Sequence, residues 1–332
     1  MRVTNLLNLP QPIVDAVSND DYTRGIANIS ATGLLAPPRQ AALLEAHGAD
    51  LEEDASDRIF SLFGKAIHAI LEHQKIGDDI REQRLYMNVD GPLGRWVVSG
   101  AMDRIAFVPA GEPDPAYPKG TIRIEDYKTA SVSEMIYGVK AERAQQLNIY
   151  RVLAELNGYK VDSLAAVFIL RDWSKVQAHD KASQPTLSSS GVAQTDYPQT
   201  HVVVHEVDIW PIEETYRFIR ERVALHQQAQ AAYRAVFPLS LEPVTLSFEE
   251  AQAALPECDD DERWARDKSY AAMKPGGKRA SKVGTEDEIK AWVAAKKEGE
   301  YTVEERSGRS LRCEFYCAAA PICEQWRALR GD

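Results

Sequence analysis

The 332-residue sequence contains no uninterrupted apolar run long enough to span a bilayer, and its first residues lack the pattern of a secretory signal. A membrane-spanning helix needs about 20 consecutive apolar residues, and a signal peptide carries a continuous apolar segment near its start. The chain opens instead with MRVTNLLNLP, in which polar side chains and a proline interrupt the apolar ones. We therefore expect a cytoplasmic protein that does not insert into a membrane.

Cysteine is also scarce, since the chain has four, and three of them form the pattern Cys313-x3-Cys317-x5-Cys323 near the C-terminus. The cytoplasm keeps thiols reduced, so this spacing indicates metal or cluster ligands rather than disulfides. The fourth cysteine, Cys258, lies well upstream of this group. The sequence thus offers three local thiol ligands and one distant one.

Basic residues are also fewer than acidic ones. The chain has 39 Lys and Arg against 50 Asp and Glu, a formal net charge of −11, which opposes general adhesion to nucleic acid. The segment 263–282 is the exception, because it has a single acidic residue, Asp267. Its basic residues are Arg263, Arg266, Lys268, Lys274, Lys278, Arg279 and Lys282. A local basic patch of this kind is compatible with a nuclease.

The length and the 44% hydrophobic content suit one large α/β domain with an appended module. We place an N-terminal extension at residues 1–56, a core at 57–240, and a C-terminal segment at 241–332 that packs on the core. A polar stretch near 174–200, rich in Ser, Gln and Thr, is predicted to be an insertion in the core. The sequence has no internal repeat.

A helix is predicted from Asp57, a candidate N-cap, to about residue 75. Its apolar residues at helical spacing are Ile59, Phe63, Ala66, Ile67 and Ile70. Such a stripe is typical of a helix face that packs against a core. His68 lies on the flank of the stripe, and Gly64, one turn earlier on the same side, leaves room for a close approach. Taken alone, a histidine in this position indicates only a partly buried polar residue.

Two strands are predicted after this helix, at 84–89 and 95–108. Asp103 lies inside the second strand, where an aspartate is unfavourable unless it caps, pairs or binds. Gly100, three residues earlier, indicates a bulge or a close backbone approach. Asp103 is therefore a candidate ligand or ion-pair partner.

A third strand, at 122–129, is the segment around which the other motifs are organised. Ile122 and Ile124 alternate with charged residues, as in a half-buried strand. The same alternation puts Asp126 and Lys128 on one face, about 7 Å apart along the strand. The carboxylate can hold a hard cation, and the ammonium can stabilise charge on a phosphate oxygen. A salt bridge on an edge strand is the alternative interpretation.

The next helix, predicted at 142–157, ends at Gly158 and carries Gln146 and Tyr150 four residues apart, hence on one face. The other expected elements are a loop at 30–39, a short helix at 40–47, strands at 164–170 and 201–209, a long helix from Pro211 that ends before Pro238, and a last helix at 285–297.

The order of these motifs resembles the PD-(D/E)XK nuclease superfamily, and within it the RecB-like exonuclease branch. The matching segments are GKAIH (64–68), SGAMDRI (99–105), DYKT (126–129) and QLNIY (146–150), within residues 57–170. The first acidic motif has Gly100 where the superfamily name has proline, as is common in this branch. The resemblance implies an α/β fold with a restriction-endonuclease-like core, in which helices flank a mixed central sheet.

The resemblance also implies roles for single residues. The ligands of Mg²⁺ or Mn²⁺ would be His68, Asp103, Asp126 and the backbone carbonyl of Tyr127. Lys128 would be catalytic together with the two aspartates. Gln146 and Tyr150 would line the site and help to hold the DNA strand. The histidine suits Mn²⁺ somewhat better than Mg²⁺.

The implied activity is metal-dependent exonucleolytic hydrolysis of DNA in recombination, repair or phage DNA processing. The expected substrate is linear DNA with a single-stranded end, and a recombination or replication protein is a candidate partner. Two alternatives stay open: a structure-selective or restriction-like endonuclease, and a non-hydrolytic subunit that binds DNA ends. We expect additional DNA contact through Lys274, Lys278 and Arg279 of the basic segment.

The cysteines extend the resemblance, because some RecB-like nucleases, phage-encoded ones among them, carry a four-cysteine iron–sulfur cluster. In those proteins one ligand precedes the nuclease core, whereas Cys258 follows it here. The resemblance implies a [4Fe–4S] cluster on Cys258, Cys313, Cys317 and Cys323, with zinc or free thiols as alternatives. Phe315, Tyr316 and Trp326 are expected to bury the cluster thiolates.

Overall fold

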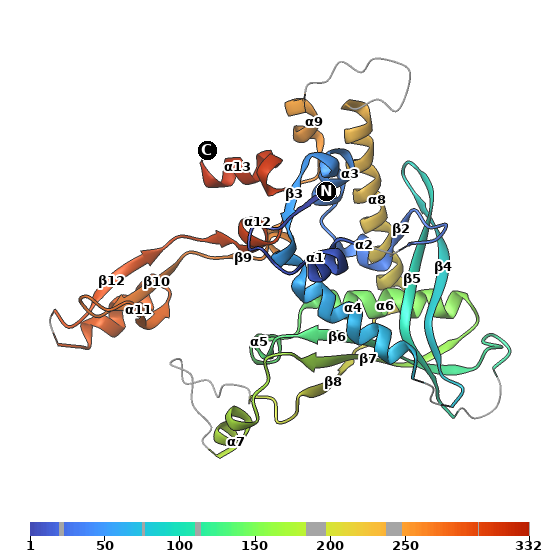
Figure 1. Cartoon of the computed structure of the whole chain (residues 1–332), viewed down its shortest axis with the longest axis horizontal. Coiled ribbons are helices and arrows are strands. Elements are labelled where there is room, and N and C mark those ends of the chain that lie inside the picture. Colours follow the sequence, from blue (N-terminus) through green and yellow to red (C-terminus); the bar gives the residue numbers. More distant parts are fainter. Residues whose placement is uncertain are drawn as a thin grey trace. The chain divides into compact units, whose positions relative to one another are not determined.

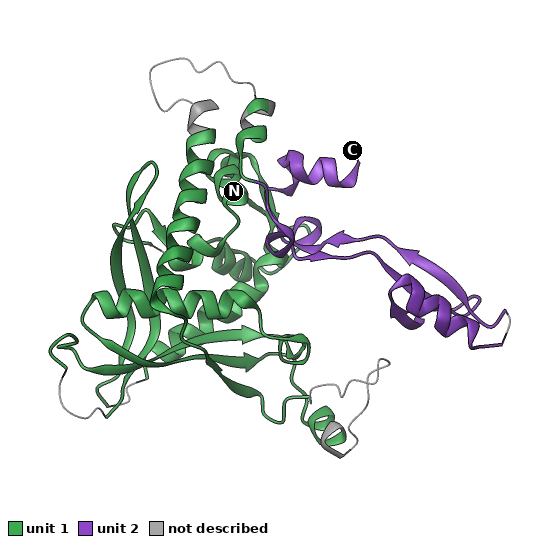
Figure 2. Ribbon diagram, turned by 180° about the vertical axis from the view of Figure 1, so that it is seen from behind, with its two compact units in different colours: residues 1–188, 193–256 green, residues 189–192, 257–332 purple. Residues whose placement is uncertain are grey.

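The structure is a computed structural model that describes residues 1–19, 23–74, 77–109, 114–183, 197–236, 248–297 and 299–331 (Figure 1). The chain forms two units. Unit 1 contains residues 1–188 and 193–256, and unit 2 contains residues 189–192 and 257–332 (Figure 2). The N-terminal residues and the 57–240 segment apart from residues 189–192 thus belong to unit 1, and unit 2 holds all four cysteines.

Unit 1 is built on a six-stranded mixed sheet of order β2-β5-β6-β7-β8, with β4 paired to β5. The strands are β2 (Ile29–Ser30), β4 (Ile80–Gly91), β5 (Gly94–Phe107), β6 (Thr121–Ala130), β7 (Lys160–Leu170) and β8 (Val202–Val207). β2 and β5 are parallel, as are β6 and β7, and the other pairs are antiparallel. The predicted α/β class with a mixed central sheet is confirmed.

Helices flank this sheet, as predicted (Figure 1). They are α1 (Gln11–Ser18), α2 (Ala31–Leu35), α3 (Pro38–His47), α4 (Ile59–Glu72), α5 (Val132–Tyr137), α6 (Ala141–Leu156), α7 (Lys175–Ser183), α8 (Ile212–Val236) and α9 (Phe248–Ala254). Two short strands, β1 (Arg2–Thr4) and β3 (Glu52–Asp54), pair beside them, and η1 (Gly48–Asp50) and η2 (Ala55–Arg58) are 3₁₀ turns. None of the described helices is both long and apolar enough to cross a membrane.

The α5–α6 crossover makes the parallel pairing of β6 and β7 possible, because parallel strands need a long connection. Leu147 and Leu153 of α6 are fully buried in the core, together with Ile122 and Ile124 of β6. A Cβ atom at Gly100 would lie 2.7 Å from side-chain atoms of Leu153 and of Tyr150 on α6. The close approach predicted at Gly100 is therefore confirmed, and it brings α6 onto β5.

α4 and α6 cover opposite faces of β6. Asp126 is bonded to Gln146 of α6, whereas a Cβ atom at Gly64 of α4 would lie 3.7 Å from Thr129 Oγ1. Asp126 and Thr129 are three positions apart, so their side chains point to opposite faces of the strand. A Cβ atom at this distance would make ordinary van der Waals contact, so the packing of α4 on β6 does not itself require glycine at position 64.

The predicted apolar stripe of α4 is confirmed only in part. Ile59 and Ile67 are half-buried, on the side of the helix that carries Gly64 and His68, but Phe63 is 52% exposed and Ile70 is 59% exposed. The physical reason is that His68 hydrogen-bonds to a backbone carbonyl of β6, and this contact orients the helix.

Two local predictions at helix starts are also wrong. Asp57 caps nothing: the turn η2 precedes α4, and Asp54 caps that turn by accepting from the amide of Ser56 at 3.0 Å. The expected loop at 30–39 contains α2, because the Ser30 hydroxyl accepts from the amide of Gly33 at 3.0 Å. Both cases follow the preference of Asp and Ser for N-cap positions.

Elsewhere in unit 1 the predictions are close. α6 ends at Leu156 and is followed by Gly158 at φ +90°, a left-handed conformation that glycine adopts without strain. β7, β8 and α8 occupy the predicted segments within a few residues. The polar stretch near 174–200 begins with α7, while its residues 184–196 lie outside the described part of the chain, as does Pro238.

Unit 2 contains a three-stranded antiparallel sheet, β11-β10-β12, with α11 packed on it. The elements are α10 (Asp260–Arg263), β9 (Ala265–Arg266), β10 (Ser269–Met273), β11 (Ala280–Gly284), α11 (Glu286–Ala294), β12 (Thr302–Arg306), β13 (Arg309–Ser310), α12 (Leu311–Phe315), η3 (Ala320–Ile322) and α13 (Glu324–Arg330). α11 is the helix predicted at 285–297. It is started by a capping box between Thr285 and Glu288 and ends at Ala294, three residues early. The prediction that it is the last helix is wrong, because α12 and α13 follow it.

Candidate active site

The candidate site lies where β5 and β6 separate. Their pairing runs from Phe107 opposite Ile122 to Arg104 opposite Glu125, and stops there. The Arg104 guanidinium is bonded to Glu125 at 2.6 Å, which ties the two strands together at the last pair. Asp103 and Asp126 are the next residues, so the two carboxylates stand at the fork of the sheet.

His68 of α4 closes one side of this fork. Its Nε2 atom lies 3.1 Å from the carbonyl oxygen of Tyr127, and its Nδ1 atom lies 3.4 Å from Asp103 Oδ1. The amide of Tyr127 donates to Asp103 Oδ2 at 2.6 Å. Three of the groups predicted to hold a metal ion, namely the His68 ring, the Asp103 carboxylate and the Tyr127 carbonyl, are therefore in direct contact.

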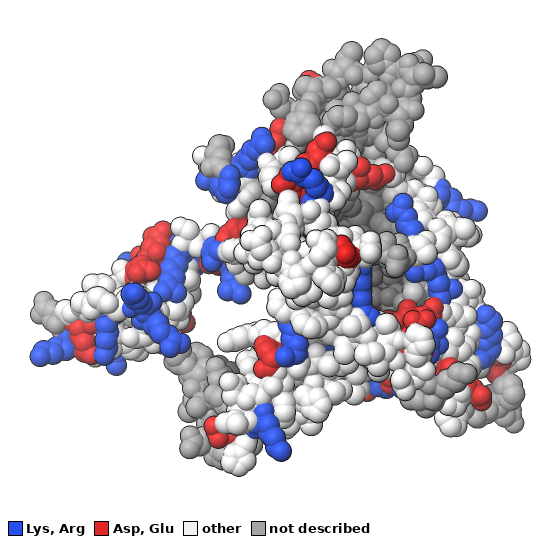
Figure 3. All heavy atoms as spheres, viewed as in Figure 1, with Lys and Arg blue, Asp and Glu red and all other residues white. Residues whose placement is uncertain are grey.

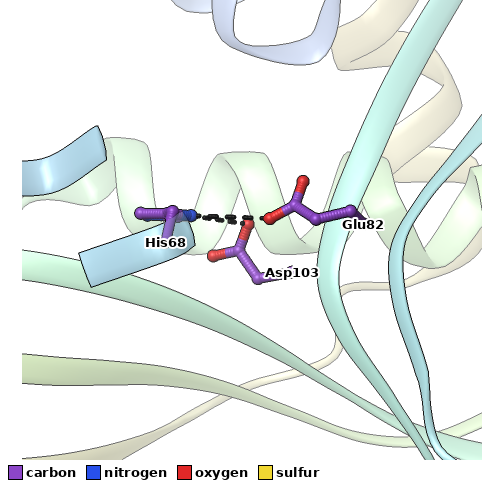
Figure 4. A group of neighbouring side chains, drawn as sticks. All are labelled: His68, Glu82 and Asp103. Carbon is purple, nitrogen blue, oxygen red and sulfur yellow. Dashed lines mark ion pairs between the residues drawn. The ribbon is translucent and has the colours of Figure 1, made fainter. Parts of the chain in front are cut away.

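Glu82 of β4 joins this group and was not predicted from the sequence. Its Oε1 atom lies 3.6 Å from His68 Nδ1, and one ligand atom each of His68, Glu82 and Asp103 fall within 4.8 Å of one another. Figure 4 shows the three side chains pointing toward one another from α4, β4 and β5. Among the residues that the structure describes, no other group of three His, Cys, Asp or Glu side chains is this compact.

The backbone at Glu82 is unusual. Its φ of +48° lies in the left-handed region, which a non-glycine residue adopts only at a cost of about 1–3 kcal/mol. The β4–β5 ladder pairs Arg81 with Arg104 and Gln83 with Met102, and leaves out the pair between them, Glu82 and Asp103. Such strain is kept where the surrounding structure enforces it, and it is concentrated at functional sites.

A signal for Glu82 was present in the sequence. The β4–β5 hairpin turns at Pro92-Leu93, between Gly91 and Gly94. A two-residue loop at that point fixes the register and places residue 82 opposite Asp103. The predicted strand begins at residue 84, two residues after Glu82. The prediction therefore does not include the position of Glu82 opposite Asp103.

The second half of the site lies around Asp126. Lys128 Nζ is 2.5 Å from Asp126 Oδ2, and Gln146 Nε2 donates to Oδ1 at 3.3 Å. The same Gln146 nitrogen lies 2.6 Å from the Tyr150 hydroxyl. Asp126 is 2% exposed and Gln146 and Tyr150 are also buried, so the carboxylate is held in one orientation. The alternation of β6 and the helical spacing of α6 thus bring these four predicted residues together.

The charges at the fork are strongly perturbed. Hydrogen bonds to Asp103 and then to Glu82 raise the pKa of His68 to about 10, so the metal-free site holds an imidazolium between two carboxylates. Burial raises the pKa of Asp126, and the negative charge of Asp103 raises it further, while Lys128 lowers it. The site therefore contains neighbouring carboxylates whose negative charges require a positive charge beside them.

Lys274, Lys278 and Arg279, the other predicted DNA contacts, lie in unit 2. They are exposed in the turn between β10 and β11, where Gly276 adopts φ +73°. Lys274 Nζ also lies 5.7 Å from the ring centroid of Tyr301. These basic side chains therefore cluster at the tip of one hairpin.

The cysteines lie near one another at the other end of unit 2. The side-chain amide of Gln325, in α13, forms two hydrogen bonds with the backbone of Cys258. Its Nε2 atom donates to the carbonyl at 2.8 Å, and its Oε1 atom accepts from the amide at 2.9 Å. The guanidinium of Arg263 bridges the carbonyl of Cys258, at 3.2 Å, and the hydroxyl of Ser310, at 2.8 Å. These bonds bring the distant cysteine to the segment that carries the other three.

The thiols are in a partly buried environment. Burial, together with the nearby Cys313 and Cys323, raises the pKa of Cys317 to about 11. The expectation that Phe315 and Tyr316 bury the thiolates is wrong, since these rings are 62% and 69% exposed. They instead pack on neighbouring side chains: Tyr316 on Trp264 at 5.3 Å, and Phe315 under the guanidinium of Arg309 at 5.1 Å, both between centres. Trp326 is half-buried.

No protein-family model matches the chain, and no curated protein matches it. Several solved structures do match, among them that of SSO0001. This match has 13% sequence identity and a TM-score of 0.39, and it covers 71% of this chain and 95% of SSO0001. A likeness at this TM-score carries no argument about fold details or function.

Proposed function

We propose that the chain is a metal-dependent deoxyribonuclease of the PD-(D/E)XK superfamily, with a restriction-endonuclease-like core, that acts as an exonuclease on linear DNA. One observation carries the proposal. Where β5 and β6 part, Asp103 and His68 both contact the backbone of Tyr127, and Tyr127 is flanked by Asp126 and Lys128. Two carboxylates, an imidazole and an ammonium at one point are what phosphodiester hydrolysis requires.

The donor atoms fit a divalent cation. Carboxylate and carbonyl oxygens suit Mg²⁺ or Mn²⁺, and the imidazole of His68 favours Mn²⁺. A cation bound by His68 Nδ1, Glu82 and Asp103 would neutralise phosphate charge and lower the pKa of a water molecule, while His68 Nε2 keeps its contact with the Tyr127 carbonyl. His68 must first release the proton that Asp103 and Glu82 stabilise, so cation binding competes with protonation of the ring.

The groups around Asp126 have the complementary role. The Lys128 side chain is 18% exposed, so its ammonium is open to a phosphate on the solvent side while it stays bonded to Asp126. Gln146 holds the other carboxylate oxygen, and its contact with Tyr150 fixes the amide. This arrangement orients Asp126 and Lys128 toward the scissile phosphate before the substrate arrives, which lowers the cost of organising the site during reaction.

The test is an assay with end-labelled linear DNA, single- and double-stranded, and with closed-circular DNA, in the presence of Mg²⁺ or Mn²⁺. Degradation confined to the linear substrates is the expected result. Cleavage of the circle would replace the exonuclease with an endonuclease. Binding of DNA ends without cleavage in either metal would leave a non-hydrolytic end-binding subunit of a recombination, repair or phage DNA-processing assembly.

We further propose that Cys258, Cys313, Cys317 and Cys323 jointly hold a [4Fe–4S] cluster, with zinc as the alternative. The bonds from Gln325 and Arg263 to the Cys258 backbone support a shared centre, because they hold the distant cysteine in place without any ligand. No three of the four thiols, all of which the structure describes, lie within 4.8 Å of one another. Sulfurs that share one zinc ion, at about 2.3 Å from it, must be closer than this, so the spacing does not fit a preformed zinc site.

A further inference from the structure

The helix that supplies His68 exposes aromatic side chains beside the candidate active site. Phe60 is 57% exposed and Phe63 is 52% exposed, and their ring centroids are 6.4 Å apart. α4 has no fully buried residue over its 14 positions. Figure 3 shows that the surface over α4 is mostly free of charged side chains. Exposed apolar groups that are clustered in this way mark a binding surface.

An arginine side chain adds a positive charge to this surface. The guanidinium of Arg171, at the end of β7, lies 4.3 Å from the ring centroid of Phe60. Arg171 is exposed and forms no ion pair with a carboxylate in the described part of the chain, since the neighbouring Asp172 binds Ser131 and the amide of Val132. Its amide donates to the carbonyl of Ala130 at 3.0 Å. The cation and the ring therefore lie at the end of β6 that follows Lys128.

The positions of these groups define a short track. The site of Gly64 on α4 lies next to Thr129, and Phe60 is one helical turn further from His68. Along the helix, Phe63 and Phe60 lie about 7.5 and 12 Å from His68 at 1.5 Å per residue. These values are the axial parts of the separations, and at roughly 3.4 Å per stacked nucleotide they correspond to two to four nucleotides.

We propose that Phe60 and Phe63, with Arg171, form a stacking platform for unpaired bases two to four nucleotides from the phosphate that is cleaved. Exposed rings with an adjacent guanidinium are how proteins bind single-stranded nucleic acid without reading its sequence. A duplex does not offer free base faces, so the platform selects a strand with an unpaired end. The inference rests on the proposed nuclease function and specifies its substrate.

A protein surface is the other occupant that the apolar stripe of α4 would suit. That stripe includes Ile70, which is 59% exposed and has no aromatic ring. The aromatic residues and Arg171 favour nucleic acid, because bases stack on rings and phosphates attract the guanidinium. Ile70 therefore provides a matched control: it is on the same helix and equally exposed, and a stacking platform does not need it.

The test uses the full chain carrying Lys128→Ala, to prevent hydrolysis, and single-stranded oligonucleotides with 2-aminopurine at successive positions. We expect quenching of the probe at positions two to four from the bound end. Phe60→Leu and Phe63→Leu should each weaken single-strand binding about tenfold and abolish the quenching, since leucine preserves apolar contact but cannot stack. Ile70→Ala should change neither, and no variant should alter the affinity for blunt duplex.

Three results would overturn the platform: unchanged binding by both leucine variants, equal loss in Ile70→Ala, or a sedimentation coefficient that shows a dimer for the wild type and a monomer for Ile70→Ala. The proposed function is judged separately, with Lys128 intact. DNA hydrolysis by the wild type together with normal binding by the leucine variants removes only the platform. Phenylalanine-dependent binding without any hydrolysis by the wild type removes the nuclease and keeps the platform.

Discussion

The ammonium of Lys128 lies 2.5 Å from Oδ2 of Asp126, a carboxylate that is 2% exposed and whose pKa burial raises. Lys128 opposes this effect, because its positive charge lowers the pKa of the carboxyl group. The pair links two requirements of the proposed reaction, because Asp126 must be negative at the fork and Lys128 must offer positive charge to a phosphate.

Lys128→Ala and Asp126→Asn should each reduce DNA hydrolysis by about 10³-fold or more, since each removes charge from the reaction centre. Mn²⁺ binding, measured by calorimetry, should survive Lys128→Ala and weaken in Asp126→Asn. Circular dichroism should show that both variants remain folded. Cleavage at near wild-type rate by either one would refute the assignment of the site.

Glu82→Gln should lower the affinity for Mn²⁺ by about tenfold, because it removes a charged oxygen from the group formed with His68 and Asp103. The matched control is Glu72→Gln, an exposed carboxylate on α4. Calorimetry or the Mn²⁺ resonance signal measures the affinity without any substrate. Equal affinity in the Glu82 variant and the wild type would mean that the strained backbone at residue 82 has no part in cation binding.

The stability of the metal-free protein should fall as the pH rises above neutrality. The pKa of His68 is raised to about 10 in the folded protein, against 6.5 for an unperturbed ring, so between these values the folded state binds more protons than the unfolded state. The stabilisation by His68 is complete below pH 6.5 and is lost toward pH 10. Urea unfolding in EDTA across this range should show the decline, and His68→Gln should flatten it. Parallel curves for the two proteins would contradict the ion-pair geometry.

Much of this site follows from local periodicity. The alternation of β6 puts Asp126 beside Lys128, and helical spacing puts Gln146 next to Tyr150. Glu82 required the register of a hairpin whose strand start was misplaced by a few residues. Sequence patterns are least reliable at the ends of elements, and one shifted end was enough to hide a candidate ligand.

The orientation of α4 shows a different limit of prediction from sequence. An amphipathic pattern identifies an apolar stripe but not what covers it. Here the polar contact of His68 with the Tyr127 carbonyl decides which edge meets the sheet, and Phe63 and Ile70 are left exposed. A polar contact thus prevailed over the burial of apolar side chains, which no count of apolar residues could have revealed.

Charge reversal at the tip of the β10–β11 hairpin should weaken DNA binding. The variant Lys274→Glu, Lys278→Glu, Arg279→Glu removes three exposed cations, and each lost phosphate contact lowers the slope of log K against log salt by about 0.9 for duplex DNA. Lys290→Glu is the control, because Lys290 is a cation of unit 2 that is already paired with Glu286 at 2.5 Å. A salt slope identical to that of the wild type would exclude the hairpin tip from the DNA interface.

The four cysteines should act as one unit that orders residues 258–331. A centre shared by Cys258 and the local group of Cys313, Cys317 and Cys323 closes a long loop, which costs a few kcal/mol of chain entropy. Metal–thiolate bonding exceeds that cost, even though the buried thiols must first lose their protons.

Anaerobically purified protein should therefore be brown, and Cys258→Ser should lose iron together with the protease resistance of unit 2. Gln325→Ala tests the geometry without removing a ligand: it frees the Cys258 backbone from both hydrogen bonds, so it should accelerate loss of the cluster in air and leave the anaerobic iron content near that of the wild type. Colourless protein with bound zinc would keep the shared centre and reject the cluster. Metal-free protein with four titratable thiols and a protease-resistant unit 2 would reject both, since the fold would then need no ligand to hold Cys258 beside the other three.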